Sequence, residues 1–210
     1  MSLAVEAAHR LRTMKETKYI RQAYNGNYCY VSKRKGIYKY DECGMIWNLL
    51  EDVEPAAFRE IQQALHVQPD VEKPTASQLH HFFRFRHFEH RENEHFERIK
   101  SMKEIQPGDI LSWQAKVALI LEAPVEDGGY GPGICKVKVV DSKQVPNHDE
   151  DSRPADERCF EDERGTRTGM GTGYIGMKEE GGGYFALEVD PKPGRKFHFE
   201  STGAVVARPY

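Results

Sequence analysis

Residues 38–50 read YKYDECGMIWNLL, and they predict a short strand that passes directly into a helix. Asp41 stands at the N-cap position of this helix, where its carboxylate accepts hydrogen bonds from the unpaired N–H groups of the first turn. The apolar residues that follow recur at the three- and four-residue spacing of a single helical face. They are Met45, Ile46, Leu49 and Leu50.

Cys43 lies in the first turn of this helix. The partial positive charge and the unpaired N–H groups of a helix N-terminus lower the pKa of a thiol, so this position suits a nucleophile. A cysteine at the same place also serves as a small buried apolar residue. The sequence therefore leaves both roles open for Cys43.

The neighbouring segments predict further helices and short strands. Periodic apolar residues predict a helix over residues 3–15, and Pro55 suits the first turn of a helix that continues to Leu65. Residues 17–40 are rich in tyrosine and lysine and are broken by glycine-containing turns, which indicates short strands. The aromatic and histidine-rich residues 77–100 predict one more helix.

After Pro107 the sequence changes from helical patterns to strand patterns. Residues 142–168 are charged and without a clear pattern, so we expect a long loop there. The glycines of residues 169–173 favour a turn into a hairpin. The strands are expected over residues 109–113, 117–123, 134–141, 171–177, 184–189 and 204–207.

The order of the elements predicts an α+β fold, in which N-terminal helices pack on an antiparallel sheet. The 210 residues are expected to form a single domain. Its helical half covers about residues 1–103 and its sheet half about residues 104–210.

Charge and composition exclude several classes of function. The chain has 30 basic and 33 acidic residues, a net charge of −3, which argues against a nucleic-acid partner. The longest apolar run, residues 117–121, is too short to cross a bilayer, and the N-terminus shows no signal-peptide pattern. The four cysteines form no Cys-x-x-Cys pair, so we expect no metal and no cofactor.

Residues 77–100 carry a separate hypothesis. On a helix, His87, His90 and Glu94 share one face, as metal ligands on one helix must, although four arginines in the same stretch repel a cation. The interleaved Phe, Arg and His side chains are also typical of a platform for single-stranded nucleic acid, which the interspersed glutamates oppose. We expect a solvated helix here.

Two segments resemble one protein family. Asp41–Ile46 resembles the Asp-Cys-Ser-Gly-Phe-Val opening of the nucleophile helix in NlpC-type bacterial cell-wall peptidases, which have a papain-like fold. Gln106–Trp113 is similar to the Pro-Gly-Asp-Ile/Leu start of a strand in that family, and Val205–Pro209 resembles its closing strand. The resemblance implies a papain-like α+β domain, and a location in the cell envelope or outside the cell.

The same alignment places other residues where the family has its catalytic groups. Glu42 stands at the position of the nucleophilic cysteine, and Lys116 at that of the histidine base. Asp141 stands where the family keeps the polar residue that orients the histidine. Lysine, with an ordinary pKa of about 10.4, is protonated at pH 7 and is a poor base. We therefore expect Glu42, Lys116 and Asp141 to form an ion-pair cluster in a degenerate cleft.

This reading implies a domain that has kept the fold and lost the original chemistry, and that binds peptides or peptidoglycan-derived fragments. The alternative is an active cysteine peptidase or amidase acting on cell-wall peptides. A shift of one residue at the helix start would then make Cys43 the nucleophile, with His148 as the base and Asp141 as its orienting group.

Overall fold

The computed structural model describes residues 2–20, 30–65, 74–85, 95–113, 116–127, 131–143, 150–180, 183–188, 198–199 and 203–210. Within these residues the chain is a mixed α+β protein with four α-helices and a large antiparallel sheet, which confirms the predicted class. The helices are α1 (Leu3–Thr13), α2 (Glu42–Val53), α3 (Pro55–Leu65) and α4 (Ala76–Phe85). Among the helices described, none is long and apolar enough to cross a bilayer.

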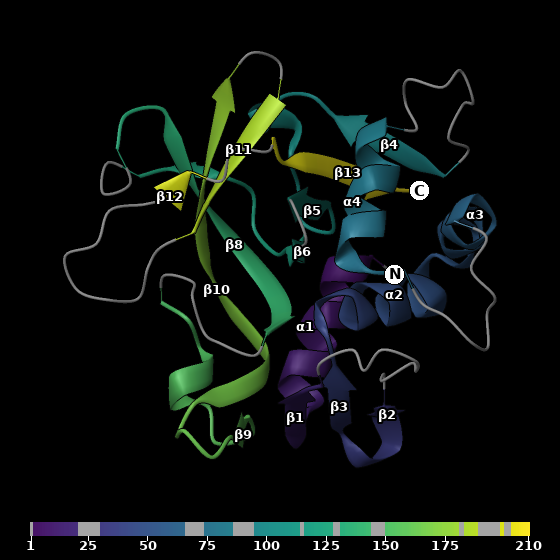
Figure 1. The fold of residues 1–210 in the computed structure, drawn as a ribbon, viewed down its shortest axis with the longest axis vertical. Coiled ribbons are helices and arrows are strands. Elements are labelled where there is room, and N and C mark those ends of the chain that lie inside the picture. The colour runs from purple at the N-terminus through teal and green to yellow at the C-terminus, as the bar shows by residue number, and fades with distance from the viewer. Residues whose placement is uncertain are drawn as a thin grey trace.

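A small sheet precedes α2 and lies at one end of the molecule (Figure 1). Its strands are β1 (Glu16–Tyr19), β2 (Tyr30–Ser32) and β3 (Ile37–Tyr40), in the order β1-β3-β2. β3 is parallel to β1 and antiparallel to β2. Tyr38 and Tyr40 are buried on the core side, so the alternate residues Ile37 and Lys39 face outward.

The large sheet follows the order β12-β11-β10-β8-β6-β5-β13-β4, and its neighbouring strands pair antiparallel. The short strands β7 and β9 pair with β8 and β10. A bridge between Tyr184 and Ala204 joins β11 to the residue before β13, so the sheet curls back on itself. The strands are β4 (Phe96–Ile99), β5 (Ile110–Trp113), β6 (Lys116–Ile120), β7 (Val125–Glu126), β8 (Ile134–Lys143), β9 (Phe160–Glu161), β10 (Arg167–Glu180), β11 (Gly183–Glu188), β12 (His198–Phe199) and β13 (Val205–Pro209).

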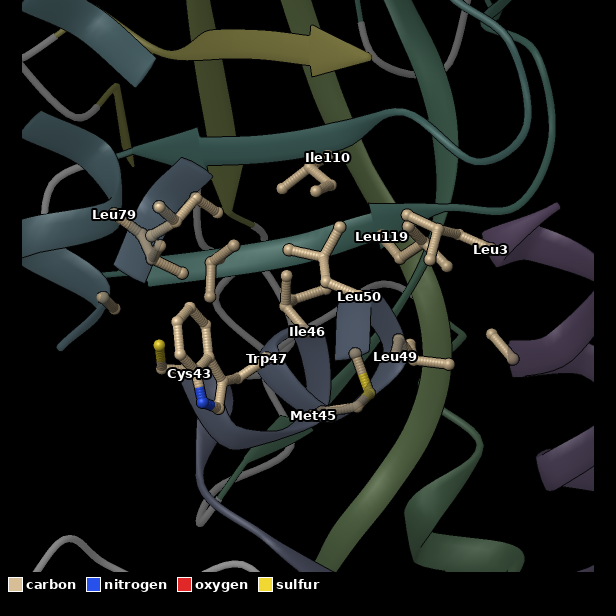
Figure 2. Packing of buried hydrophobic residues seen from close by; sticks show 14 of the residues in the cluster. Leu3, Cys43, Met45, Ile46, Trp47, Leu49, Leu50, Leu79, Ile110 and Leu119 are labelled. Carbon is tan, nitrogen blue, oxygen red and sulfur yellow. The ribbon is translucent and has the colours of Figure 1, made fainter. Parts of the chain in front are cut away.

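The two faces of this sheet bury two separate apolar clusters. On the face that the helices cover, Leu119 of β6 packs in one cluster with Ile46 and Leu50 of α2 (Figure 2). On the opposite face, Ala118 and Ile120 of the same strand belong to a second cluster inside the curled sheet. Because side chains alternate along a strand, each residue of β6 can be assigned to one face.

A buried arginine joins α1 to α2. Arg10 is fully buried, and its guanidinium donates hydrogen bonds to Glu6, to the Tyr40 hydroxyl and to Asn48 at 2.7–2.8 Å. It also pairs with Asp52 near the end of α2. These contacts satisfy the charge of a residue type that is seldom fully buried, and they fix α2 against α1 and β3.

The prediction of a helix over residues 77–100 is wrong at its C-terminal end. The helix α4 ends at Phe85, and Phe96–Ile99 form β4, in which Ile99 pairs with Val206 of β13. Phe96 and Ile99 lie three residues apart, which fits a helical period, but the main-chain pairing with β13 decides the structure. His87, His90 and Glu94 lie outside the described residues.

The expected loop over residues 142–168 also contains regular structure. β8 continues to Lys143, a 3-10 turn η4 covers Arg153–Ala155, and β9 follows it. The glycine-rich residues 169–173, predicted as a turn, lie within the long strand β10. The Arg153 side chain lies so close to residue 171 of this strand that only glycine fits. A Cβ at this position would lie 2.8 Å from Nε of Arg153.

We predict that Gly171→Ala destabilises the protein by about 1–3 kcal/mol, the usual cost of forcing extra atoms into a packed interior. The measurement is the free energy of unfolding in urea. Gly203→Ala is the matched control, since the nearest atom to its new Cβ would lie 3.6 Å away, and it should cause no loss. Equal stability of Gly171→Ala and the wild type would contradict the placement of Arg153 over residue 171.

Candidate functional site

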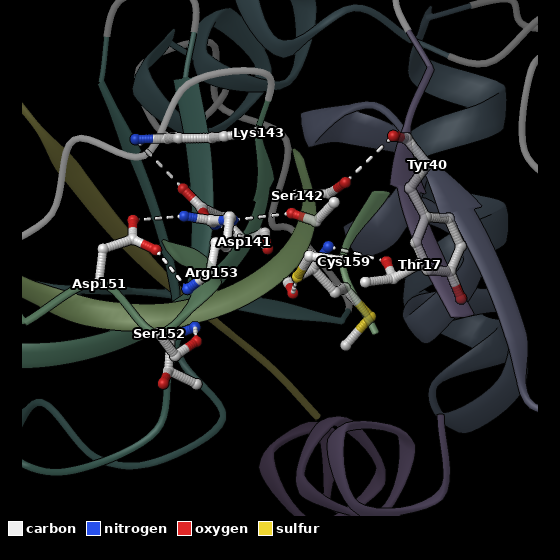
Figure 3. A network of polar contacts seen from close by, with 12 residues as sticks. Thr17, Tyr40, Asp141, Ser142, Lys143, Asp151, Ser152, Arg153 and Cys159 are labelled. Atoms are coloured by element: carbon white, nitrogen blue, oxygen red, sulfur yellow. Dashed lines mark hydrogen bonds and ion pairs between the residues drawn. The ribbon is translucent and has the colours of Figure 1, made fainter. Parts of the chain in front are cut away.

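The candidate site begins at the first turn of α2. Asp41 is the N-cap, as predicted, and its carboxylate accepts a hydrogen bond of 2.6 Å from the Gly44 N–H. Tyr40, the residue before the cap, accepts a hydrogen bond of 3.0 Å at its carbonyl from the Ser142 hydroxyl. This bond holds the end of β8 beside the start of α2 (Figure 3). Asp141, the residue before Ser142, therefore lies close to the helix start along β8.

Cys43 lies in the apolar interior. Its side chain is 3% exposed and packs in the cluster that the helices bury, near Trp47 and Leu79 (Figure 2). The thiol donates a hydrogen bond of 2.7 Å to the carbonyl of Pro74, just before α4. The structure thus gives Cys43 the surroundings of a small buried residue.

Lys116 is the first residue of β6 and is half-buried. It pairs with Trp113 at the end of the β5–β6 hairpin. By the alternation of the strand it lies on the face of Ala118 and Ile120, which is opposite to the face that contacts α2. Lys116 and Cys43 are therefore on different faces of the sheet, and the structure does not bring them together.

Asp141 is fully buried and carries two ion pairs (Figure 3). Its carboxylate pairs with Arg153 of η4 and, at 3.2 Å, with Lys143 of the same strand. Val137 and Val139 belong to the cluster inside the curled sheet, so the alternation of β8 places Asp141 on their face, as predicted.

Arg153 is the centre of this polar network. Its side chain is fully buried, and it donates hydrogen bonds to the carbonyls of Gly169 at 2.8 Å and Asp141 at 3.2 Å. A second acidic residue, Asp151, accepts from its Nη1 at 2.5 Å and from its main-chain N–H at 3.0 Å. Two carboxylates and two carbonyls thus surround one guanidinium, as a buried charge requires.

This network was not predicted from the sequence. Asp141 was expected in a cluster with Glu42 and Lys116, and the segment containing Asp151 and Arg153 was expected to be a loop. The available signal was the three alternate glycines of β10, Gly169, Gly171 and Gly173, because a strand that carries glycine at close spacing lets another part of the chain approach. The side chain of Glu42 and the whole of His148 lie outside the described residues, so their predicted roles stay predictions.

The Pro-Gly-Asp segment has a structural role. Gly108 has φ +101°, which favours glycine, and the Asp109 carboxylate accepts a hydrogen bond of 2.9 Å from the Gln106 N–H across the turn. Arg208 of β13 binds both oxygens of the same carboxylate, at 2.8 and 3.0 Å. Burial raises the pKa of Asp109, and the hydrogen bond from Arg208 acts in the opposite direction. This motif anchors the start of β5.

A buried serine and histidine also meet outside the predicted site. His80 of α4 places its Nδ1 3.2 Å from the hydroxyl of Ser112 on β5. Burial lowers the pKa of His80, with a contribution from the charge of Arg84. Ser112 is fully buried, so a substrate has no access to its hydroxyl, and we read the pair as a polar contact within the core.

Comparison with protein-family models, with curated protein sequences and with solved structures found no match for this chain. The NlpC-type resemblance therefore stays a prediction from the quoted segments. Within the described part of the chain, no group of three or more His, Cys, Asp or Glu side chains could hold a metal ion.

We predict that Arg153→Met lowers the free energy of unfolding by about 3–5 kcal/mol, because it removes the guanidinium that pairs with the buried carboxylates of Asp141 and Asp151. Asp141→Leu should cost a similar amount. The double variant should lose less than the sum, since both members of the pair are then gone. Urea unfolding measures all three.

The control for this cycle is Arg167→Met, which removes a partly exposed pair with Glu161 and should cost about 1 kcal/mol or less. A loss for Arg153→Met no larger than that of this control would contradict the network described above.

Proposed function

We propose that this chain is a papain-like domain of the NlpC type whose catalytic positions now serve the fold, and that it binds peptides or peptidoglycan-derived fragments without cleaving them. The main support for a loss of peptidase activity is that Cys43 is buried and that its thiol donates a hydrogen bond to the Pro74 carbonyl. A papain-like mechanism needs an accessible thiolate, a neutral imidazole and a polar group that orients it.

The contact of Cys43 favours the neutral thiol. A carbonyl oxygen accepts a hydrogen bond from S–H and repels the negative charge of a thiolate. The thiolate is the nucleophilic form of cysteine, so a residue held in this way is a poor nucleophile.

The remaining described cysteines are no better suited to attack. Burial raises the pKa of Cys159 to about 11, and nearby acidic groups add to this effect. Burial, with the charges of Glu126 and Glu179, also raises the pKa of Cys135. Both thiols are therefore predominantly protonated at neutral pH.

Asp141 cannot readily act as the orienting group of a catalytic histidine. Its carboxylate is engaged by Arg153 and Lys143 within a fully buried network. Recruiting it for an imidazole would break an ion pair that is shielded from water, at a cost of several kcal/mol.

The binding part of the proposal rests on the layout of the site and on the family resemblance. The Ser142–Tyr40 hydrogen bond keeps the start of α2 against the end of β8, and Lys116 begins the neighbouring strand. The half-buried Lys116 lies on the face of the sheet opposite α2, where its ammonium can meet the carboxylates of an acidic peptide.

The second candidate is the active peptidase or amidase with Cys43, His148 and Asp141. It needs a reactive sulfur, which the thiol contact with Pro74 opposes. Thiol labelling separates the two functions.

We predict that iodoacetamide at pH 6 modifies Cys43 of the folded protein no faster than Cys135, and far more slowly than in the unfolded chain. The reason is that burial excludes the reagent and the reactive thiolate is absent. Mass spectrometry of the labelled peptides over time measures each cysteine. Selective and rapid labelling of Cys43 would favour the peptidase instead.

For binding, we predict that soluble muropeptides titrated into the protein give a saturable calorimetric signal and are recovered with unchanged mass. Lys116→Ala should weaken this binding about fivefold or more, as expected for a charge-assisted contact worth over 1 kcal/mol. Lys103→Ala, which changes an exposed lysine of the turn Met102–Glu104, should have no effect. Hydrolysed ligand, or no binding, would overturn the proposal.

A further inference from the structure

Charge is distributed unevenly along this chain. Residues 15–40 contain seven basic residues and one acidic residue, a net charge of +6, while the whole chain carries −3. The rest of the molecule therefore carries −9. The whole-chain balance that argued against an anionic partner averages over this difference. Lys18 and Lys39 lie on the small sheet, and three more of the basic residues form the turn η1 (Lys33–Lys35).

Four side chains form a row across the outer face of this sheet. Lys18 of β1 is in register with Lys39 of β3, and Lys39 is in register with Tyr30 of β2. On the other side of β1, Thr17 forms a parallel β-bridge with Cys159. The residues that follow these two, Lys18 and Phe160, therefore lie side by side. We call Tyr30, Lys39, Lys18 and Phe160 the basic row; β2, β3, β1 and β9 lie near one another at this end of the molecule (Figure 1).

The basic row has an aromatic ring at each end and two ammonium groups between them. Tyr30 is 51% exposed and Phe160 is 41% exposed, which is unusual for large aromatic residues. The Lys18 ammonium lies 3.7 Å from the centre of the Phe160 ring, and that of Lys39 lies 6.0 Å from the centre of the Tyr30 ring. These contacts hold the two ammonium groups on the outer face.

We propose that the basic row binds single-stranded nucleic acid, with phosphates on Lys18 and Lys39 and bases stacked on Tyr30 and Phe160. Cations that follow the backbone, combined with aromatic rings that stack bases, are the recurring parts of such surfaces. Four neighbouring segments span about 14 Å at the usual strand spacing, a width suited to two or three nucleotides.

Two other anionic partners fit the row less well. An acidic peptide supplies charge for the lysines but no planar group for the two rings. A lipid surface needs aromatic side chains that reach past the lysines into the bilayer, whereas the Lys18 ammonium lies over the Phe160 ring. A phosphate that binds Lys18 would draw its ammonium away and uncover the ring for a base.

Glu16 moderates the charge of the row. Its carboxylate pairs with Lys39 at 2.6 Å, and its side chain is 46% exposed. A phosphate must compete with this carboxylate for Lys39. Removing the negative charge should therefore strengthen binding.

The test is fluorescence anisotropy with a labelled oligothymidylate of about 12 nucleotides, a length within the range of single-strand sites. We expect Lys18→Ala and Lys39→Ala each to reduce the salt slope of log K by about 0.7. Tyr30→Ala and Phe160→Ala should each weaken binding about fivefold or more, the lower range for one stacked base, without changing that slope. Glu16→Gln should tighten binding.

The controls are Lys103→Ala, an exposed lysine elsewhere, and Phe85→Ala, whose ring is 41% exposed like that of Phe160. Neither should change the affinity. The proposal is overturned if the wild type does not bind, if the controls lose as much as the row variants, or if the aromatic variants bind normally. It is also overturned if polyglutamate or anionic vesicles bind with the same dependence on the row. None of these readouts involves the site near α2.

Discussion

The fully buried carboxylate of Asp141 is the constraint on which the site depends, because a buried charge must be compensated within the protein. Arg153 provides that compensation and brings the segment around η4 against the long strand β10. β10 in turn needs Gly171, so that the arginine side chain fits over the sheet. This ion pair thus holds η4 against β8 and β10. It also fixes the end of β8, whose next residue, Ser142, holds the start of α2 through the carbonyl of Tyr40.

The same arrangement explains why residues that resemble catalytic groups in the sequence make contacts within the folded core. A helix that begins beside the end of a strand is a geometry in which a thiol and its partners can meet. Here the thiol of Cys43 turns into the helical cluster, and Lys116 lies on the other face of the sheet. Asp141 is held by cations of its own surroundings. Of these groups, the side chains of Cys43 and Asp141 are buried in the protein.

The sequence predicted what local patterns determine. These features depend on spacing and capping within a few residues: the N-cap at Asp41, the apolar face of α2, the helix starting at Pro55 and the strands predicted over residues 109–113 and 134–141. The rest depends on partners far along the chain. β4 forms because it pairs with β13. Arg153 is buried because its guanidinium pairs with Asp141 and donates a hydrogen bond to the Gly169 carbonyl of β10. The local pattern does not distinguish Phe96–Ile99 from a helix. The glycines of β10 indicate a close approach but do not identify Arg153 as the residue that approaches, which is why both segments were predicted wrongly.

The central claim is that Cys43 is a neutral, hydrogen-bonded thiol of the core. The infrared S–H stretching band of this residue tests it most directly, obtained as the difference between the wild type and Cys43→Ala at pH 7. We expect the band to be present and to lie at lower frequency than that of a thiol without a hydrogen bond, because the S–H group donates to the Pro74 carbonyl. An absent band would mean that the sulfur is a thiolate, and that result would contradict the account.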